Sequence, residues 1–286
     1  MKKNKYILAL LLGLCVLFLS SCNLKEERIF LIAPSEKNID EGFEGFYRAD
    51  SYGLYTKKIE RKFDDVQSEK KVVIDKEIDV LYEYTECINK NNDDDNVGEY
   101  YCSYDVYKND LATIKYLHDS DIICFYYRAS DKDEVCGQIS ENDIKIAATN
   151  FLCQYIGIND LNEYVYEGIS IDSLGRNVVT FIKYIDEYRT DEVLSVWVDN
   201  SGEVSAYNGY NLNKYDKMSE QCCNSEIKKA ENAIKEKLDK CNLKDLSYID
   251  SQVVANTSGK LFLEYYISYI DKSGMKNITT VLTEID

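Results

Sequence analysis

Basic residues are scarce in this chain of 286 residues. Its 34 lysines and arginines stand against 51 aspartates and glutamates, which gives a formal net charge of −17. Proteins that bind nucleic acid need clustered basic side chains, so this balance argues against that class of partner. It also argues against electrostatic docking onto anionic lipid. We interpret the acidic charge as a source of solubility.

Histidine is almost absent, and the patterns of several enzyme classes are missing. His118 is the single histidine, and no C-x-x-C pair occurs, which argues against a zinc site. Neither the nucleophile elbow G-x-S-x-G nor the phosphate loop G-x-x-x-x-G-K-[ST] is present. We interpret His118 as part of a turn with Asp119 and Ser120. The sequence therefore predicts that the protein is not an enzyme, with no catalytic residue and no cofactor.

The N-terminus combines a basic start with a short apolar run. Lys2, Lys3 and Lys5 precede an apolar segment from Tyr6 to Leu19. A helix needs about 20 apolar residues to span a bilayer, so this segment is too short for comfortable spanning. A basic start, an apolar core and small residues before a break are typical of a secretory signal peptide.

The end of that apolar run carries the one specific motif of the sequence. Leu19-Ser20-Ser21-Cys22 resembles the lipobox of bacterial lipoproteins. The resemblance implies that residues 1–21 are removed and that the thiol of Cys22 receives a diacylglyceryl group. Two or more acyl chains, at roughly 0.8 kcal/mol per buried CH₂, give stable anchoring. We therefore expect a lipid-anchored protein on the extracytoplasmic face of the cell membrane.

Eight further cysteines besides Cys15 and Cys22 raise the question of disulfides; they are Cys87, Cys102, Cys124, Cys136, Cys153, Cys222, Cys223 and Cys241. An even number in an exported chain permits a disulfide framework, and eight cysteines allow about 105 pairings. Cys87 with Cys102, and Cys124 with Cys136, are close enough in sequence to staple hairpins. Free thiols are the alternative.

The acidic stretch Asp93-Asp94-Asp95-Asn96 raises the question of calcium. An EF-hand loop has the pattern D-x-[DN]-x-[DN]-G. Counted from Asp93, the fifth position is Val97, so the pattern fails even though Gly98 follows. We expect a solvated turn and no metal, and Asp93 and Asp95 are at most weak calcium candidates.

The first half of the mature chain is rich in strand-forming residues. Residues 22–40 are interpreted as a tether that contains one short strand around Ile29–Ile32. Residues 41–139 are expected to form an antiparallel β-rich domain, because β-branched and aromatic residues dominate several segments. Those segments are 72–84, 99–107, 111–117 and 121–129.

The second half suggests two copies of one unit, at 140–215 and 216–286. Helices are expected over 143–156 and 226–238, because apolar residues recur there at i, i+3, i+4 and i+7. Ser140 and Ser225 are the expected N-caps. The second copy ends one strand earlier than the first. The strands expected after the two helices are 168–172, 178–186, 192–199, 203–207, 251–255, 261–271 and 277–285.

Both copies contain a D-x-x-G turn, from Asp199 to Gly202 and from Asp271 to Gly274. Together with the helical pair Ala147-Ala148, these turns resemble the PepSY-like modules of exported bacterial proteins. The resemblance implies binding or inhibition of peptidases, or regulation of neighbours in the envelope, and it carries over no active-site residues. The predicted fold class is α+β: an antiparallel β-rich N-terminal domain followed by two PepSY-like repeats of a helix and an antiparallel sheet.

These features predict a lipid-anchored extracytoplasmic binding or regulatory protein whose partner is an envelope protein or peptide. Strand tyrosines such as Tyr265, Tyr266 and Tyr269 could line a binding platform, although ordinary strand packing is the plainer interpretation. Two alternatives stay open. One is a surface hydrolase, either dependent on calcium or independent of it. The other is a lipoprotein that binds a solute or a glycan. Abundant asparagine, lysine and isoleucine with one proline favour a low-GC Gram-positive source.

Overall fold

The structure is a computed structural model, in which the described residues are 28–32, 42–48, 58–74, 76–89, 100–129, 139–158, 161–209, 212, 214–215, 224–256 and 260–285. Strands dominate it. They are β1 (Ile29–Ile32), β2 (Tyr47–Arg48), β3 (Lys58–Arg61), β4 (Glu69–Ile74), β5 (Lys76–Asn89), β6 (Tyr100–Lys108), β7 (Ala112–Leu117), β8 (Ile123–Arg128), β9 (Tyr164–Ile171), β10 (Asn177–Ile185), β11 (Tyr188–Val198), β12 (Val204–Asn208), β13 (Lys244–Ala255), β14 (Leu261–Ile270) and β15 (Lys276–Glu284).

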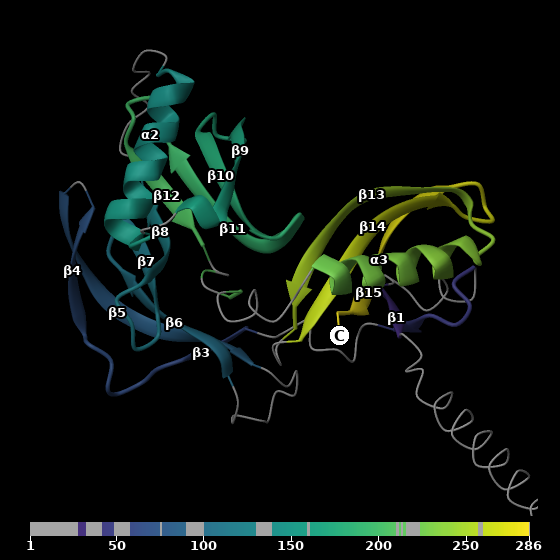
Figure 1. Cartoon of the computed structure of the whole chain (residues 1–286). Coiled ribbons are helices and arrows are strands. Elements are labelled where there is room, and N and C mark those ends of the chain that lie inside the picture. Colours follow the sequence, from purple (N-terminus) through teal and green to yellow (C-terminus); the bar gives the residue numbers. More distant parts are fainter. Residues whose placement is uncertain are drawn as a thin grey trace, which may run out of the picture.

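Helices are few. In the described part of the chain there are two α-helices, α2 (Glu141–Phe151) and α3 (Asn224–Asp239). A π-helical turn, η3 (Leu152–Ile156), continues α2, and a 3₁₀ turn, η4 (Leu161–Glu163), precedes β9. Figure 1 shows β3 to β12 with α2 on its left side, and β1 and β13 to β15 with α3 on its right side.

The predicted fold class was wrong. All 15 strands belong to one hydrogen-bonded network, in the order β2-β1-β15-β14-β13-β11-β12-β8-β7-β6-β5-β3, with β9, β10 and β4 branching from it. Strand β12 pairs antiparallel with β8, so the expected N-terminal domain and the strands after α2 share one sheet. The protein is therefore a β-rich fold with a mixed sheet. It is not a β-rich domain followed by two helix-plus-sheet repeats, and the predicted domain boundaries stay a prediction.

The reason for this error is physical. Alternating side chains mark a strand in the sequence, but they do not specify which strand lies beside it. Unpaired N–H and C=O groups at a strand edge pair with whichever edge the tertiary packing brings close. Strand β1 shows this, because it lies in the expected tether and yet pairs antiparallel with β15 at the other end of the chain. Its side chains Ile29, Phe30 and Leu31 are buried.

The segment 72–84, which the sequence marked as rich in strand-forming residues without a break, contains the end of one strand and the start of another. It is divided between β4, which ends at Ile74, and β5, which begins at Lys76. The two strands pair antiparallel, with Ile74 opposite Lys76. The break between β4 and β5 is not apparent in the sequence, because strand-forming residues continue through it and no glycine or proline marks it.

Helix α2 forms where a cap and an apolar stripe coincide. Ser140 is the N-cap, as predicted, and its side chain accepts a hydrogen bond from the backbone N–H of Asp143. Ile144, Ala148 and Phe151 are buried against β10, β11 and β12. The left-handed Gly157, with φ of 75°, ends the π-helical turn.

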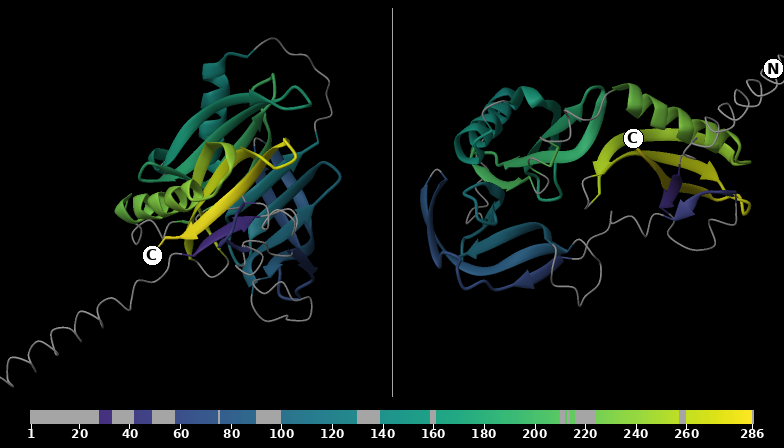
Figure 2. Two further views of the ribbon diagram at one scale, coloured as in Figure 1. Left: turned by 90° about the vertical axis from the view of Figure 1, so that its right-hand side faces the viewer. Right: turned by 60° about the horizontal axis from the view of Figure 1, so that its bottom comes forward.

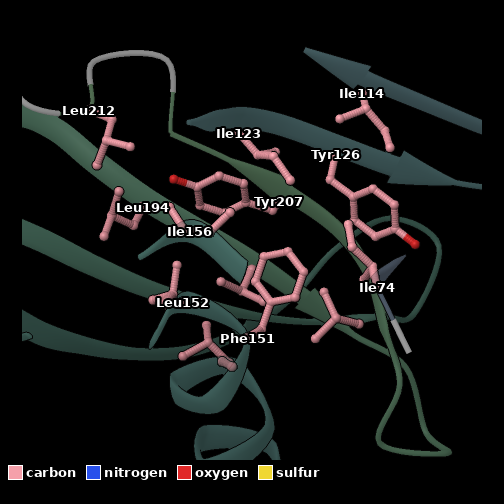
Figure 3. Close-up of a cluster of buried hydrophobic side chains, with 14 of the residues drawn as sticks. Ile74, Ile114, Ile123, Tyr126, Phe151, Leu152, Ile156, Leu194, Tyr207 and Leu212 are labelled. Carbon is pink, nitrogen blue, oxygen red and sulfur yellow. The ribbon is translucent and has the colours of Figure 1, made fainter. Parts of the chain in front are cut away.

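The core under α2 is aromatic. The ring of Phe151 lies 6.0 Å from that of Tyr126 and 5.6 Å from those of Tyr155 and Tyr207. Figure 3 shows Phe151 among Tyr126, Tyr207 and Leu152. Tyr126 comes from β8 and Tyr207 from β12, so this cluster joins strands from both halves of the chain. Offset and tilted ring pairs add to the free energy gained from burial alone.

Helix α3 covers a second core. It begins at Asn224, one residue before the expected cap Ser225. Its buried face packs against β1, β14 and β15. The right-hand view in Figure 2 shows α3 lying over this group of strands. The buried residues of this face are Ile227, Ala230, Ile234 and Leu238.

The two predicted D-x-x-G turns are present at the ends of hairpins. In the β14–β15 hairpin, Asp271 Oδ1 accepts hydrogen bonds from the backbone N–H groups of Ser273 at 2.8 Å and Met275 at 3.0 Å. Gly274 has φ of 85°, a conformation that suits glycine. The same contacts recur around Asp199 in the β11–β12 hairpin. Each turn is therefore fixed by an aspartate side chain that replaces missing backbone partners.

Candidate functional site

Several residues predicted from the sequence cannot be placed. Cys22, Asp93, Asp95 and Cys136 lie outside the described residues. Lipid attachment at Cys22 and the weak calcium candidates therefore stay predictions. Among the residues that the structure does describe, no group of three or more His, Cys, Asp or Glu side chains could hold a metal ion.

The register of β5 and β6 bears on the first predicted disulfide. Cys87 stands opposite Ser103, whereas Cys102 stands opposite Ile88. The Ser103 hydroxyl donates to Cys87 Sγ at 3.6 Å, and Cys87 is a buried free thiol. Directly opposite residues approach each other most closely, so this register does not favour a bridge between Cys87 and Cys102.

Cys124 and Cys136 were candidates for a disulfide, and this possibility stays untested because Cys136 lies outside the described residues. Cys124 is buried in β8, and its thiol donates to the backbone carbonyl of Lys115 at 3.3 Å. This hydrogen bond links β8 to its neighbour β7.

The sequence placed His118 in a turn and missed its contacts. Its Nδ1 lies 2.8 Å from Asp105 Oδ1, and the Thr85 hydroxyl donates to the same oxygen at 2.6 Å. The Tyr82 hydroxyl extends this chain with a 2.9 Å hydrogen bond to Thr85. The ring of Phe63 lies 5.3 Å from the imidazole ring. No sequence motif signals this cluster, because its members come from four separate segments.

A buried aspartate that orients a histidine is also found in enzymes, where the free ring nitrogen acts as a general base. Here His118 Nε2 lies 3.5 Å from the exposed Asp119 carboxylate. In the described part of the chain, no hydroxyl or thiol is hydrogen-bonded to that nitrogen. We therefore assign the Asp105–His118 pair to the joining of β5, β6 and β7.

A second polar cluster lies where β11 meets β13. This pairing connects two groups of strands, β3 to β12 on one side and β1, β2 and β13 to β15 on the other. Thr190 of β11 pairs in parallel with Val253 of β13. Glu192 is fully buried, and its carboxylate accepts hydrogen bonds from the Tyr164 hydroxyl and from the backbone N–H of Tyr215. A buried carboxylate is costly unless such donors surround it.

Tyr215 completes this junction from the segment after β12. Its ring is fully buried, and its hydroxyl donates to Asp191 and accepts from the backbone N–H of Ala255 at 3.0 Å. Asp191 also pairs with Lys214 Nζ at 2.7 Å. Burial raises the pKa of the nearby Glu264 carboxyl, against the lowering effect of its hydrogen bond from Gln252. The cluster ties β11 to β13 and β14.

Glu231 connects α3 to the sheet, and its pKa predicts how the stability of the fold depends on pH. Burial acts against its ionisation, but hydrogen bonds from Lys235, Tyr188 and Tyr265 outweigh burial and lower its pKa to about 2. A carboxyl whose pKa is lower in the folded state stabilises the fold above its usual value of 4.5. This contribution is lost as the pH falls from about 5 towards 2.

We expect Glu231→Gln to remove that part of the pH dependence. The difference in unfolding free energy between wild type and variant should be largest at neutral pH and shrink towards pH 2. Chemical denaturation at a series of pH values measures it. Glu236→Gln on the same helix is the matched control, because among the described residues Glu236 pairs with Lys240 alone, at the surface. An equal loss in both variants would contradict the assignment.

The candidate binding surface is the outer edge of β9 and the turn that follows it. Four apolar side chains are exposed there: Val165 at 47%, Tyr166 at 36%, Ile171 at 73% and Leu174 at 74%. In the part of the chain that the structure describes, β9 pairs only with β10. Exposed apolar groups beside an open strand edge are typical of an interaction site.

One further surface feature is a shallow, open depression on the outer side of α3. All of its lining residues except Ala233 have polar side chains; they are Ser225, Lys228, Lys229, Asn232, Ala233 and Glu236. Small-molecule sites are usually enclosed and largely apolar, so this depression is a weaker candidate than the β9 edge.

The comparisons with known proteins add no relative. No protein family matches the chain, and no curated protein and no solved structure is significantly similar to it. Within the described residues, no helix has the length and apolarity to cross a bilayer.

Proposed function

We propose that this protein is a lipid-anchored extracytoplasmic binding protein that acts on a protein or peptide partner of the cell envelope. The observation that carries the proposal is the β9 edge, where Val165, Tyr166 and Ile171 are exposed beside an open strand edge. The lipobox resemblance at Cys22 supports the location. A regulator of a neighbouring enzyme, such as a peptidase, fits the same surface.

The alternatives raised by the sequence gain no specific support. A surface hydrolase would need a nucleophile within reach of His118, and the described contacts of that imidazole are with the carboxylates of Asp105 and Asp119. A solute-binding protein would need an enclosed pocket, whereas the depression on α3 is open and shallow.

The anchoring part of the proposal is tested at Cys22. We expect Cys22→Ala to abolish incorporation of labelled palmitate and removal of residues 1–21, because the acyl chains are attached through that thiol. Cells grown with the labelled fatty acid, followed by immunoprecipitation and mass analysis of the N-terminus, provide the measurement. Cys15→Ala is the matched control, since Cys15 lies inside the apolar run, and it should leave both unchanged. Undiminished labelling of Cys22→Ala would overturn the anchoring proposal.

A further inference from the structure

We propose that β9 binds an extended basic segment of an envelope protein as an added strand. This inference rests on the proposed function and specifies how the partner is held. In β-strand addition, the main chain of the bound segment supplies the hydrogen bonds, and the pockets along the edge select its side chains.

The backbone of β9 has the geometry that this mode requires. Strand β9, Tyr164–Ile171, pairs antiparallel with β10 on one side, with Glu167 left out of the register at a bulge. Alternate residues of an antiparallel strand direct their N–H and C=O groups away from the partner, and at an edge these groups lack a strand to bond to. Within the described residues, no strand lies on the outer side of β9. An added strand would satisfy these groups.

The terminal strands of the network differ in how strongly their edges are protected, and β9 is the least protected of them. Natural proteins protect sheet edges with short strands, charged residues, proline or bulges. Strand β2 has two residues, β3 reads KIER, and β4 carries Lys70 and Lys71. The sequence of β9, YVYEGISI, contains neither lysine nor proline. Its protection is confined to the middle of the strand, where Glu167 and a bulge near Gly168, whose φ is 136°, interrupt it. The register with β10 is regular on both sides of that bulge.

The two faces of β9 differ in chemistry. Tyr166 stands opposite Phe181, whose ring is 5.7 Å away, on the face that packs towards α2. Glu167 lies on the other face, where the Tyr184 hydroxyl donates to its carboxylate at 2.9 Å. Val165, opposite the buried Ile182, shares that face. A bound strand with alternating residues would therefore place apolar side chains beside Tyr166 and basic ones beside Glu167.

Charge favours a basic segment over a second copy of this chain. Glu167 is exposed on the β9 edge and has no cationic partner among the described residues, whereas Glu163, just before β9, pairs with Lys183 Nζ at 3.1 Å. The whole chain has a formal charge of −17. Pairing of two β9 strands would bring two such acidic edges and two acidic chains together. Lysine or arginine in the bound segment can instead approach Glu167 and lay its aliphatic stem on Val165.

The test uses the full chain, purified in detergent, and a blocked fluorescent decapeptide that alternates valine and lysine. We expect saturable binding, and we expect Val165→Lys/Ile171→Lys to weaken it at least tenfold. The matched control, Leu81→Lys/Ile278→Lys, adds the same charge at side chains that are 58% and 65% exposed. Those side chains lie on β5 and β15, which have neighbours on both sides, so binding should change less than twofold.

Backbone recognition is tested on the wild-type protein with N-methylated decapeptides. Methylation of alternate amides removes the donors of one edge of the peptide, so one of the two methylated series should lose binding and the other should keep it. A matching peptide of valine and glutamate should not bind. The proposal is overturned if the valine–lysine peptide fails to bind, if both methylated series bind equally, or if the edge and control variants behave alike.

Two further results separate this inference from the proposed function. If the wild-type protein sediments as a dimer and Val165→Lys/Ile171→Lys as a monomer, the occupant of the edge is a second copy and strand addition by a basic segment is wrong. Cross-linking in cells reports on the function itself. Cross-links to envelope proteins that persist in the edge variant would contradict strand addition and leave the binding function intact. Their absence in the wild type would contradict both.

Discussion

Replacing Phe151 with alanine is expected to lower the free energy of unfolding by about 3–5 kcal/mol. The side chain is 3% exposed, and its ring contacts those of Tyr126, Tyr155 and Tyr207. Its removal leaves a cavity between α2, β8 and β12, and the surrounding rings cannot fill that cavity without leaving their own contacts. Urea denaturation followed by circular dichroism measures the loss.

The control for this prediction lies on the same helix. Ile146 is 47% exposed, so Ile146→Ala should change the unfolding free energy by less than about 0.5 kcal/mol. A loss in Phe151→Ala no larger than that in Ile146→Ala would show that α2 does not depend on this core. It would also question the joining of β8 and β12, which the aromatic cluster stabilises.

The second large effect is expected at the junction of the two groups of strands. Tyr215→Phe should lower the free energy of unfolding by about 2–3 kcal/mol, because it removes a hydrogen-bond donor to Asp191 and takes the hydroxyl acceptor away from the buried backbone N–H of Ala255. Phenylalanine fills nearly the same volume, so the loss reports on these hydrogen bonds and not on packing.

Tyr127→Phe is the matched substitution for the junction. Tyr127 is 41% exposed, and removal of its hydroxyl should alter the unfolding free energy by less than about 0.5 kcal/mol. Hydrogen exchange provides a second measurement for Tyr215→Phe. Amides of β13 should exchange faster in this variant, since Val253 and Ala255 lie at the junction. Unchanged protection of β13 together with unchanged stability would contradict the role given to this cluster.

The positions of most elements followed from local patterns. The helix expected at 143–156 is α2 with its π-helical turn, and the strands expected at 111–117 and 121–129 are β7 and β8 within a few residues. The aspartate turns at Asp199 and Asp271 were readable because an aspartate and a left-handed glycine have fixed spacing in such hairpins. These features depend on residues that are close in sequence.

The grouping of those elements did not follow from local patterns. The pairing of β8 with β12 and of β1 with β15 joins segments that are far apart in sequence, and only packing selects such partners. The candidate site at β9 was likewise not predictable from local sequence patterns. Of the exposed apolar residues of β9, Ile171 belonged to the expected strand 168–172, whereas Val165 and Tyr166 lie before it. The sequence also did not show that this strand would lie at an edge.

The sequence by itself determined the local structure and the composition of this protein: the lipobox resemblance at Cys22, the acidic charge, the cap at Ser140 and the alternation of its strands. Only the tertiary structure decided which strands pair, which carboxylates are buried at the junction of β11 and β13, and which strand edge stays open. Capping, turns and alternation act between near neighbours in the chain. Edge pairing and burial depend on contacts between distant segments, and those contacts form only when the whole chain folds.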